Sequence, residues 1–209
     1  MTKKNIAILT VVLSLLIDQA SKIWVKLSMT LGESIPYIGD WARIQFVENE
    51  GMAFGMSFGA GLGKFLLTMF RIVAVFFITY YLAKIVKEKN SSKGFVFALA
   101  LILAGAVGNI IDSIFYGKIF TDSNGRIATL FPQQGYAGWL HGKVVDMLYF
   151  PILQPGVIKW PSWIPGVGGQ WIEFFPFIFN VSDACITVGV ILILLFQKRF
   201  LQENNTQSN

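Results

Sequence analysis

Residues 95–115, FVFALALILAGAVGNIIDSIF, form an apolar segment that ends in two polar residues, Asn109 and Asp112. An α-helix of about 20 mainly apolar residues spans the hydrocarbon core of a bilayer, so this segment is predicted to cross a membrane. Asparagine and aspartate are costly at bilayer depth, and their i, i+3 spacing places both on one face of the helix. The polar end therefore indicates a site inside a bundle of helices. Small residues that let helices approach closely lie along the same segment: Ala100, Ala104, Gly105 and Gly108.

The composition places the whole chain among membrane proteins. Of its 209 residues, 54% are hydrophobic and only 14% are charged. This balance is unusual for soluble domains and ordinary for proteins with several membrane spans. Residues 6–27 lack a small-x-small cleavage site, so we interpret them as a retained helix and not as a cleaved signal peptide. The predicted transmembrane helices are residues 6–27, 65–85, 95–115 and 177–196.

Lysine and arginine residues gather at one end of these four segments. They precede the first segment, connect the second to the third and follow the fourth: Lys3, Lys4, Lys84, Lys87, Lys89, Lys93, Lys198 and Arg199. The positive-inside rule makes this end cytoplasmic. Both termini are therefore expected in the cytoplasm, and residues 28–64 and 116–176 on the outer side. Because the cations follow the membrane topology, nucleic-acid binding is not expected.

The two outer segments are predicted to lie at the membrane interface. Tryptophan side chains favour the level of the lipid headgroups, and several occur here among prolines and glycines: Trp139, Trp160, Trp163 and Trp171. The expected fold is therefore an all-α membrane protein with four transmembrane helices and some β structure in the outer segments. Residues 202–209 are polar and are predicted to form a tail.

A second polar motif repeats the spacing of the first. Asn180 and Asp183, at the start of the fourth segment, match Asn109 and Asp112, at the end of the third. Both motifs are expected at the outer end of the bundle. Taken alone, this repeat pairs Asp112 with Asp183 as two carboxyl groups of one site.

Five short motifs occur in an order that points to a family. They are DQASK at 18–22, NEGMAFG at 49–55, GAVGNIID at 105–112, VVD at 144–146 and FNVSD at 179–183. On a topology of four spans, they resemble the motif blocks of the lipoprotein signal peptidases (signal peptidase II). The resemblance reaches all four helices but not most of residues 116–176.

The resemblance implies an aspartyl endopeptidase of the bacterial cytoplasmic (inner) membrane, multi-pass, with its active site toward the outer face. Such an enzyme removes the signal peptide of a diacylglyceryl-modified prolipoprotein by cutting before the lipidated cysteine. The catalytic pair that the family implies is Asp146 and Asp183, with Asp112 as the alternative to Asp146. Residues 1–201 are then a single integral membrane peptidase domain, expected to be a monomer. Its expected partners are the prolipoprotein, membrane lipids and globomycin-like inhibitors.

Such a pair of carboxyl groups works without a metal or a cofactor, because one keeps a proton while the other activates water. No His/Cys/Glu set has the spacing of metal ligands, and the single histidine, His141, is expected in an interfacial loop. Asp18 and Lys22, one helical turn apart, are expected to form an internal ion pair. The residues expected to bind substrate or to support the site are Asn49, Gly51, Asn109, Asp112, Asn180, Asp18 and Lys22.

Two positions depart from the family pattern. An arginine normally follows the Gly-Asn-x-x-Asp motif, where this chain has Ser113, and alanine is usual where it has Ser182. We expect Arg126, Lys118 or Lys143, from the long outer segment, to supply the missing positive charge.

Two other functions are open to a chain of this composition. A small transporter or channel also uses intramembrane aspartate and asparagine, but it needs polar residues through the full depth of the bilayer, whereas here they crowd the outer half. A lipid-binding membrane scaffold would explain the tryptophans, but it would give the carboxylates no function. Cleavage of a lipid-modified precursor distinguishes all three functions.

Overall fold

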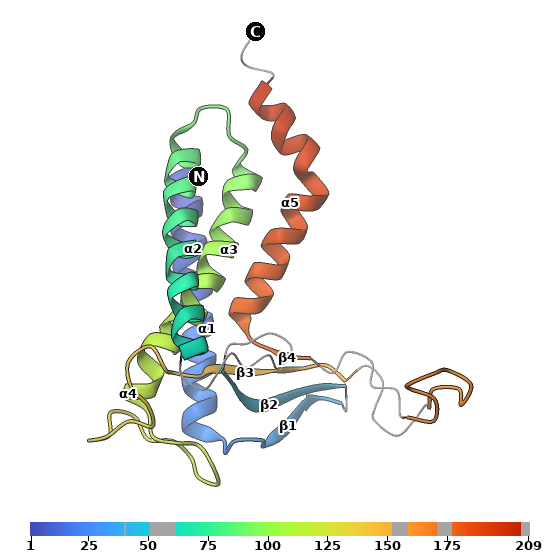
Figure 1. Ribbon diagram of the computed structural model, residues 1–209. Coiled ribbons are helices and arrows are strands. Elements are labelled where there is room, and N and C mark those ends of the chain that lie inside the picture. The colour runs from blue at the N-terminus through green and yellow to red at the C-terminus, as the bar shows by residue number, and fades with distance from the viewer. Residues whose placement is uncertain (40, 51–61, 152–158, 171–176, 206–209) are drawn as a thin grey trace.

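The computed structural model describes residues 1–39, 41–50, 62–151, 159–170 and 177–205. Within them, four long helices form a bundle (Figure 1). Four stretches, one on each of these helices, are long and apolar enough to cross a membrane, so the prediction of four spans is confirmed. The third stretch continues beyond α3 through a π-helical turn, η2 (Asp112–Tyr116), and α4 (Gly117–Ile119). The long helices are α1 (Lys3–Ser28), α2 (Leu62–Lys87), α3 (Lys93–Ile111) and α5 (Val181–Asn205).

A four-stranded antiparallel sheet lies across one end of the helices, and the N-terminus and the last turns of α5 lie at the other end (Figure 1). The strands, in their order in the sheet, are β1 (Ser34–Ile38), β2 (Ala42–Asn49), β3 (Val144–Tyr149) and β4 (Ile178–Phe179). All four come from the segments between the helices, where some β structure was expected. The predicted class, all-α, is therefore incomplete, because the fold also contains a β-sheet. Strands β2 and β3 are separated in sequence by α2 and α3 and pair only in the folded chain.

The fourth transmembrane helix begins later than predicted. The sequence pattern placed its start at residue 177, but α5 begins at Val181. Asn180 caps the helix, since its Oδ1 accepts a 2.9 Å hydrogen bond from the backbone N–H of Asp183, an arrangement that ends the extended chain and starts the helix. The two apolar residues of β4 pair with β3 instead. At its far end α5 continues to Asn205, so residues 202–205 of the predicted tail are helical.

Helix α3 is the centre of the bundle and packs on α1, α2 and α5. Its small residues make this possible: Ala100 and Ala104 are almost completely buried. A Cβ atom added at Gly105 would collide with the backbone carbonyl of Ser182 in α5, and one at Gly108 would collide with the Ser182 hydroxyl. The predicted small-residue face is confirmed. This close approach brings the polar end of α3 against α1 and α5.

The sheet is attached to the bundle by a hydrophobic cluster. Its fully buried members come from the last turns of α1, from η2 and the chain that follows it, and from β2 and β3. They include Val25, Met29, Phe46, Tyr116, Phe120, Val145 and Met147. Because side chains alternate along a strand, burial of Val145 and Met147 on this side leaves the neighbouring Asp146 to face the polar ends of the helices.

Candidate active site

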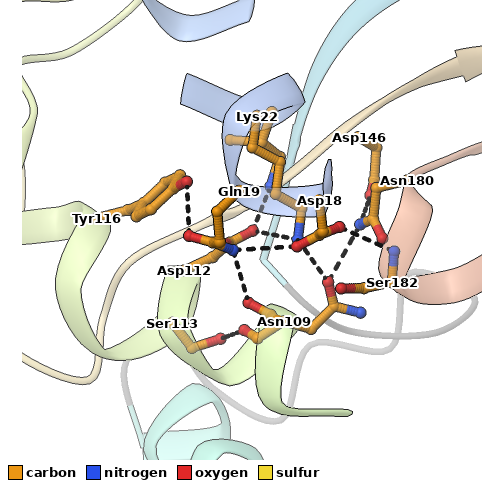
Figure 2. Close-up of polar contacts among 12 residues, drawn as sticks. Asp18, Gln19, Lys22, Asn109, Asp112, Ser113, Tyr116, Asp146, Asn180 and Ser182 are labelled. Atoms are coloured by element: carbon orange, nitrogen blue, oxygen red, sulfur yellow. Dashed lines mark hydrogen bonds and ion pairs between the residues drawn. The ribbon is translucent and has the colours of Figure 1, made fainter. Parts of the chain in front are cut away.

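A buried ion triad joins α1 to the end of α3. The Lys22 ammonium lies 2.9 Å from Asp18 Oδ2 and 2.8 Å from Asp112 Oδ2, and it donates a 2.9 Å hydrogen bond to Asn109 Oδ1 (Figure 2). The predicted ion pair between Asp18 and Lys22 is therefore confirmed. An ammonium group has three protons, so three acceptors satisfy it completely without water.

Asp112 is engaged on every side. Besides the ion pair with Lys22, its Oδ1 accepts a 3.0 Å hydrogen bond from Gln19 Nε2, and its Oδ2 accepts a 3.2 Å bond from the backbone N–H of Val145. Its side chain has no exposed surface. Through Val145, Asp112 holds the start of β3 in place, directly before Asp146.

Gln19 is a network member to which the sequence analysis gave no role. Its Nε2 also lies 3.0 Å from Asp18 Oδ2, and its Oε1 accepts a 3.1 Å hydrogen bond from the Tyr116 hydroxyl (Figure 2). A glutamine within an apolar helix is a signal of its own, because an unpaired amide is costly there. Gln19 links both carboxylates of the triad to η2.

Asp146 lies on β3, buried, and both of its carboxyl oxygens are bonded to amides. Asn49 Nδ2 donates to Oδ2 over 3.2 Å from the neighbouring strand β2, and Asn180 Nδ2 donates to Oδ1 over 2.7 Å. Burial raises the pKa of Asp146 to about 7, and the negative charge of Asp183 adds to this shift. A carboxyl group in this environment exchanges its proton near neutral pH.

Asp183 lies in the first turn of α5, where the helix dipole and the free N–H groups favour negative charge. Its Oδ1 accepts a 2.8 Å hydrogen bond from Asn109 Nδ2, and its Oδ2 accepts a 3.3 Å bond from the backbone N–H of Asn180. Asn180 thus binds both predicted catalytic carboxyl groups, Asp183 with its backbone and Asp146 with its side chain. The structure brings these two residues to one place from β3 and α5.

Arg71, on α2, is a second cation whose charge acts on the site. The carboxylate that attracts it most is Asp183, followed by Asp112 and Asp146. Arg71 belongs to none of the five sequence motifs. The available signal was an arginine inside the apolar run 65–85, since an ionised side chain at bilayer depth usually faces a polar interior.

Arg126, Lys143 and Lys118 were expected to supply the positive charge of the arginine that is usual at position 113. Their contacts lie outside the group of buried aspartates. The Arg126 Nε donates to the backbone carbonyl of Asp122 in its own exposed loop. The Lys143 ammonium lies 3.5 Å from Glu48, and Lys118 is exposed on α4. Among the described residues none of these three cations contacts a buried aspartate, whereas Lys22 and Arg71 both act on them.

The two positions that depart from the family pattern are both buried. The Ser113 hydroxyl donates a 2.9 Å hydrogen bond to the carbonyl of Asn109 one turn earlier. The backbone N–H of Ser182 donates to Asp18 Oδ1 over 2.8 Å, but its hydroxyl has no hydrogen-bond partner among the residues that the structure describes. Neither serine supplies charge to the site.

Of the predicted site residues, Gly51 lies outside the described part of the chain. His141 bonds through Nδ1 to the carbonyl of Trp139 in the loop that precedes β3. In the described ranges, no three His, Cys, Asp or Glu side chains are grouped as metal ligands would be. The arrangement present is a set of four aspartates, joined by amides and cations.

Comparison with known proteins gives a consistent result. The family model described as signal peptidase (SPase) II matches residues 10–198. A lipoprotein signal peptidase of Porphyromonas gingivalis is 50% identical over 190 residues, covering 90% of this chain and 81% of that protein. One of Amoebophilus asiaticus is 39% identical over 210 aligned positions, covering 97% and 82%. A solved bacterial membrane enzyme, 23% identical, covers 90% of both chains with a TM-score of 0.57, so the two share a fold.

Proposed function

The chain belongs to the signal peptidase II (lipoprotein signal peptidase) family, and on this basis we propose that it is an aspartyl endopeptidase of bacterial prolipoproteins. Its substrate is a precursor whose cysteine carries diacylglycerol, and the bond cut is the peptide bond before that cysteine. One observation carries the assignment of the catalytic pair. Asn180 donates to both Asp146 and Asp183, so the two carboxyl groups face one reaction site.

The two carboxyl groups would divide acid and base roles. Asp146, with its pKa near 7, donates its proton to the oxygen of the scissile carbonyl. Asp183 takes a proton from water as the water oxygen bonds to the carbonyl carbon. These two transfers give a tetrahedral intermediate with two hydroxyl groups, a diol. When its C–N bond breaks, the proton on Asp183 passes to the leaving nitrogen, and a proton from one hydroxyl group of the diol returns to Asp146. Both groups end as they began.

The alternative pair, Asp112 with Asp183, is less well supported. Asp112 is bonded to Lys22, Gln19 and the backbone of Val145. Both of its carboxyl oxygens are occupied by these donors, and its side chain has no surface open to a substrate. We therefore assign Asp112 to positioning β3.

The same proposal gives the orientation in the membrane. The aspartates lie at the sheet end of the bundle, away from the loop between α2 and α3, where Lys3 donates to the carbonyls of Glu88 and Lys89. By the positive-inside rule the lysine-rich end is cytoplasmic, with both termini. The sheet then lies at the outer face of the bacterial inner membrane, with exposed Tyr37 and Trp41 at the headgroup level. The enzyme acts there as a monomer that contacts membrane lipids and binds globomycin-like inhibitors.

Cleavage of a diacylglyceryl-modified prolipoprotein by the purified protein tests the function. We expect the wild type to cut it, Asp146→Asn and Asp183→Asn to lose activity by at least about 10³-fold, and Asp112→Asn to stay folded and partly active. Asparagine keeps the size of aspartate, and binding of the precursor by each variant is the control for folding. Activity in Asp146→Asn with none in Asp112→Asn would restore the alternative pair. A wild type that binds lipid or moves solute, but never cuts, would favour the scaffold or the transporter.

A further inference from the structure

Arg71 is a cation in the third turn of an otherwise apolar stretch of helix. It is half-buried, whereas the preceding residue, Phe70, is 70% exposed. An ionised side chain in a membrane-spanning helix is costly unless it faces a polar interior. Arg71 is therefore expected to face polar groups of the protein interior. The carboxylates that attract it are Asp183, Asp112 and Asp146.

The face of α2 that carries Arg71 is the face turned to the protein. Lys64, Thr68 and Arg71 follow an i, i+4, i+7 spacing and so lie on one side of the helix. Lys64 is 6% exposed and Thr68 is 2% exposed, while Leu66, on another side, is 56% exposed. The helix thus presents apolar residues outward and a polar stripe inward.

This polar stripe contacts the two chain segments that lead into the site. Lys64 forms a 2.8 Å ion pair with Glu50, the residue directly after β2. The Thr68 hydroxyl donates a 2.9 Å hydrogen bond to the carbonyl of Lys64 in its own helix and lies 3.4 Å from the carbonyl of Leu140, in the loop before β3. Arg71, one turn beyond Thr68, lies on the same inward face of α2.

The charges of the network need a second cation. Lys22 forms its ion pairs with Asp18 and Asp112, and its third proton goes to an amide. Arg71 is attracted most by Asp183, and then by Asp112 and Asp146. The buried Lys22 and the half-buried Arg71 thus differ in the carboxyl group that attracts each most, Asp112 for Lys22 and Asp183 for Arg71. The charged groups around Asp146 and Asp183 come from five elements. They are Asp18 and Lys22 of α1, Arg71 of α2, Asp112 of η2, and the two aspartates themselves, of β3 and α5.

We propose that Arg71 is a positioning residue of the catalytic pair, which balances the charge of Asp183 so that Asp146 and Asp183 together hold one proton at neutral pH. This inference rests on the proposed function. The active pair carries a single negative charge. Without the guanidinium, the pair binds a second proton at higher pH, and Asp183 can no longer accept one from water.

The experiment compares Arg71→Gln, Arg71→Lys and the exposed-loop control Arg126→Gln, with kcat/KM for the lipidated precursor measured across pH. We expect Arg71→Gln to lower kcat/KM at neutral pH by about 100-fold, the order seen when one charge-stabilising group is removed. Both limbs of its pH profile should move upward by about one unit. Arg71→Lys, which keeps the charge, should recover activity to within about tenfold of the wild type and restore the limbs. Arg126→Gln should match the wild type.

Several results would overturn the inference. Activity of Arg71→Gln within about twofold of the wild type would do so, and so would a loss with unmoved limbs and no recovery by lysine, which indicates a packing role only. Infrared titration of the Asp146 carboxyl group, identified by its absence in Asp146→Asn, gives a readout without cleavage. If the wild type never cuts, the proposed function fails, and the titration alone then decides Arg71: an equal titration in wild type and Arg71→Gln excludes its role.

Discussion

Lys22 of α1 and Asp112 of η2 form a 2.8 Å ion pair in which neither side chain has any exposed surface. Asp112 also accepts the backbone N–H of Val145, so a charge on the first helix fixes the position of the strand that carries Asp146. A buried ion pair is worth little as a source of net stability, but removal of one partner leaves the other charge uncompensated. The pair therefore acts mainly to hold three elements in one geometry.

We predict that Lys22→Met unfolds more easily than the wild type by about 3–5 kcal/mol, because Asp18 and Asp112 are left buried without their cation. Thermal unfolding in detergent, followed by circular dichroism, measures this. Lys84→Met is the matched control, since Lys84 is exposed at the other end of the bundle. Equal losses in the two variants would contradict a special role for the ion triad.

The two buried serines should respond oppositely to alanine. The Ser182 hydroxyl has no partner among the described residues, so Ser182→Ala should leave stability unchanged or raise it by about 1 kcal/mol, with activity kept. Ser113→Ala breaks a 2.9 Å hydrogen bond to Asn109 and should cost about 1 kcal/mol. Chemical denaturation of both variants under the same conditions gives the comparison. A larger loss at Ser182 would contradict this and would mean that its hydroxyl is hydrogen-bonded in the folded protein.

Gly105→Ala should separate α3 from α5. Its Cβ would collide with the backbone carbonyl of Ser182, which cannot move aside as a flexible side chain can, so we expect a cost of about 1–3 kcal/mol and reduced activity. Gly138→Ala is the control, because a Cβ there meets no atom within 4 Å. Unfolding temperatures and precursor cleavage of both variants check the prediction. It fails if the two variants behave alike.

The pKa of Asp146 near 7 predicts the basic limb of the pH profile. Because Asp146 acts as the acid in its protonated form, kcat/KM should fall about tenfold per pH unit above that value. Asn49 donates to the charged carboxylate and so lowers its pKa, which means that Asn49→Ala should move the limb to higher pH. Initial rates of precursor cleavage over a pH series measure both effects. A limb that moves downward in Asn49→Ala would contradict the assignment of Asp146 as the acid.

The same shift has a consequence for stability. The folded-state pKa of Asp146 is raised above its usual 3.8, so folding favours the protonated form. Its contribution to stability is fully present below about pH 4 and is lost as the pH rises through about 7. Asp146→Asn, which does not ionise, should therefore show a smaller loss of stability over this range than the wild type. Denaturation curves at several pH values test this, and an unchanged slope would contradict it.

Local patterns in the sequence were enough to predict the long helices and most of the polar residues that gather at the site. Apolar length predicted the four spans because the bilayer sets that length, and small residues predicted the close packing of α3. The pairing of Asp18 with Lys22 followed from their spacing on one helix. The start of α5 was placed too early because the apolar residues of β4 extend the hydrophobic run, and only their pairing with β3 shows that they form a strand.

The sequence by itself thus determined the four apolar spans, the family and the list of aspartates and asparagines that gather at one end of the bundle. Only the tertiary structure decided which partners these residues have: Asp112 pairs with Lys22, Asp146 accepts from Asn49 and Asn180, and Asp183 accepts from Asn109. The reason is physical. Hydrophobic length and helical spacing are local properties of the chain. The partners of a buried charge depend instead on which donors from distant segments lie next to it in the folded protein, and α2 and β3 come close to the site only through folding.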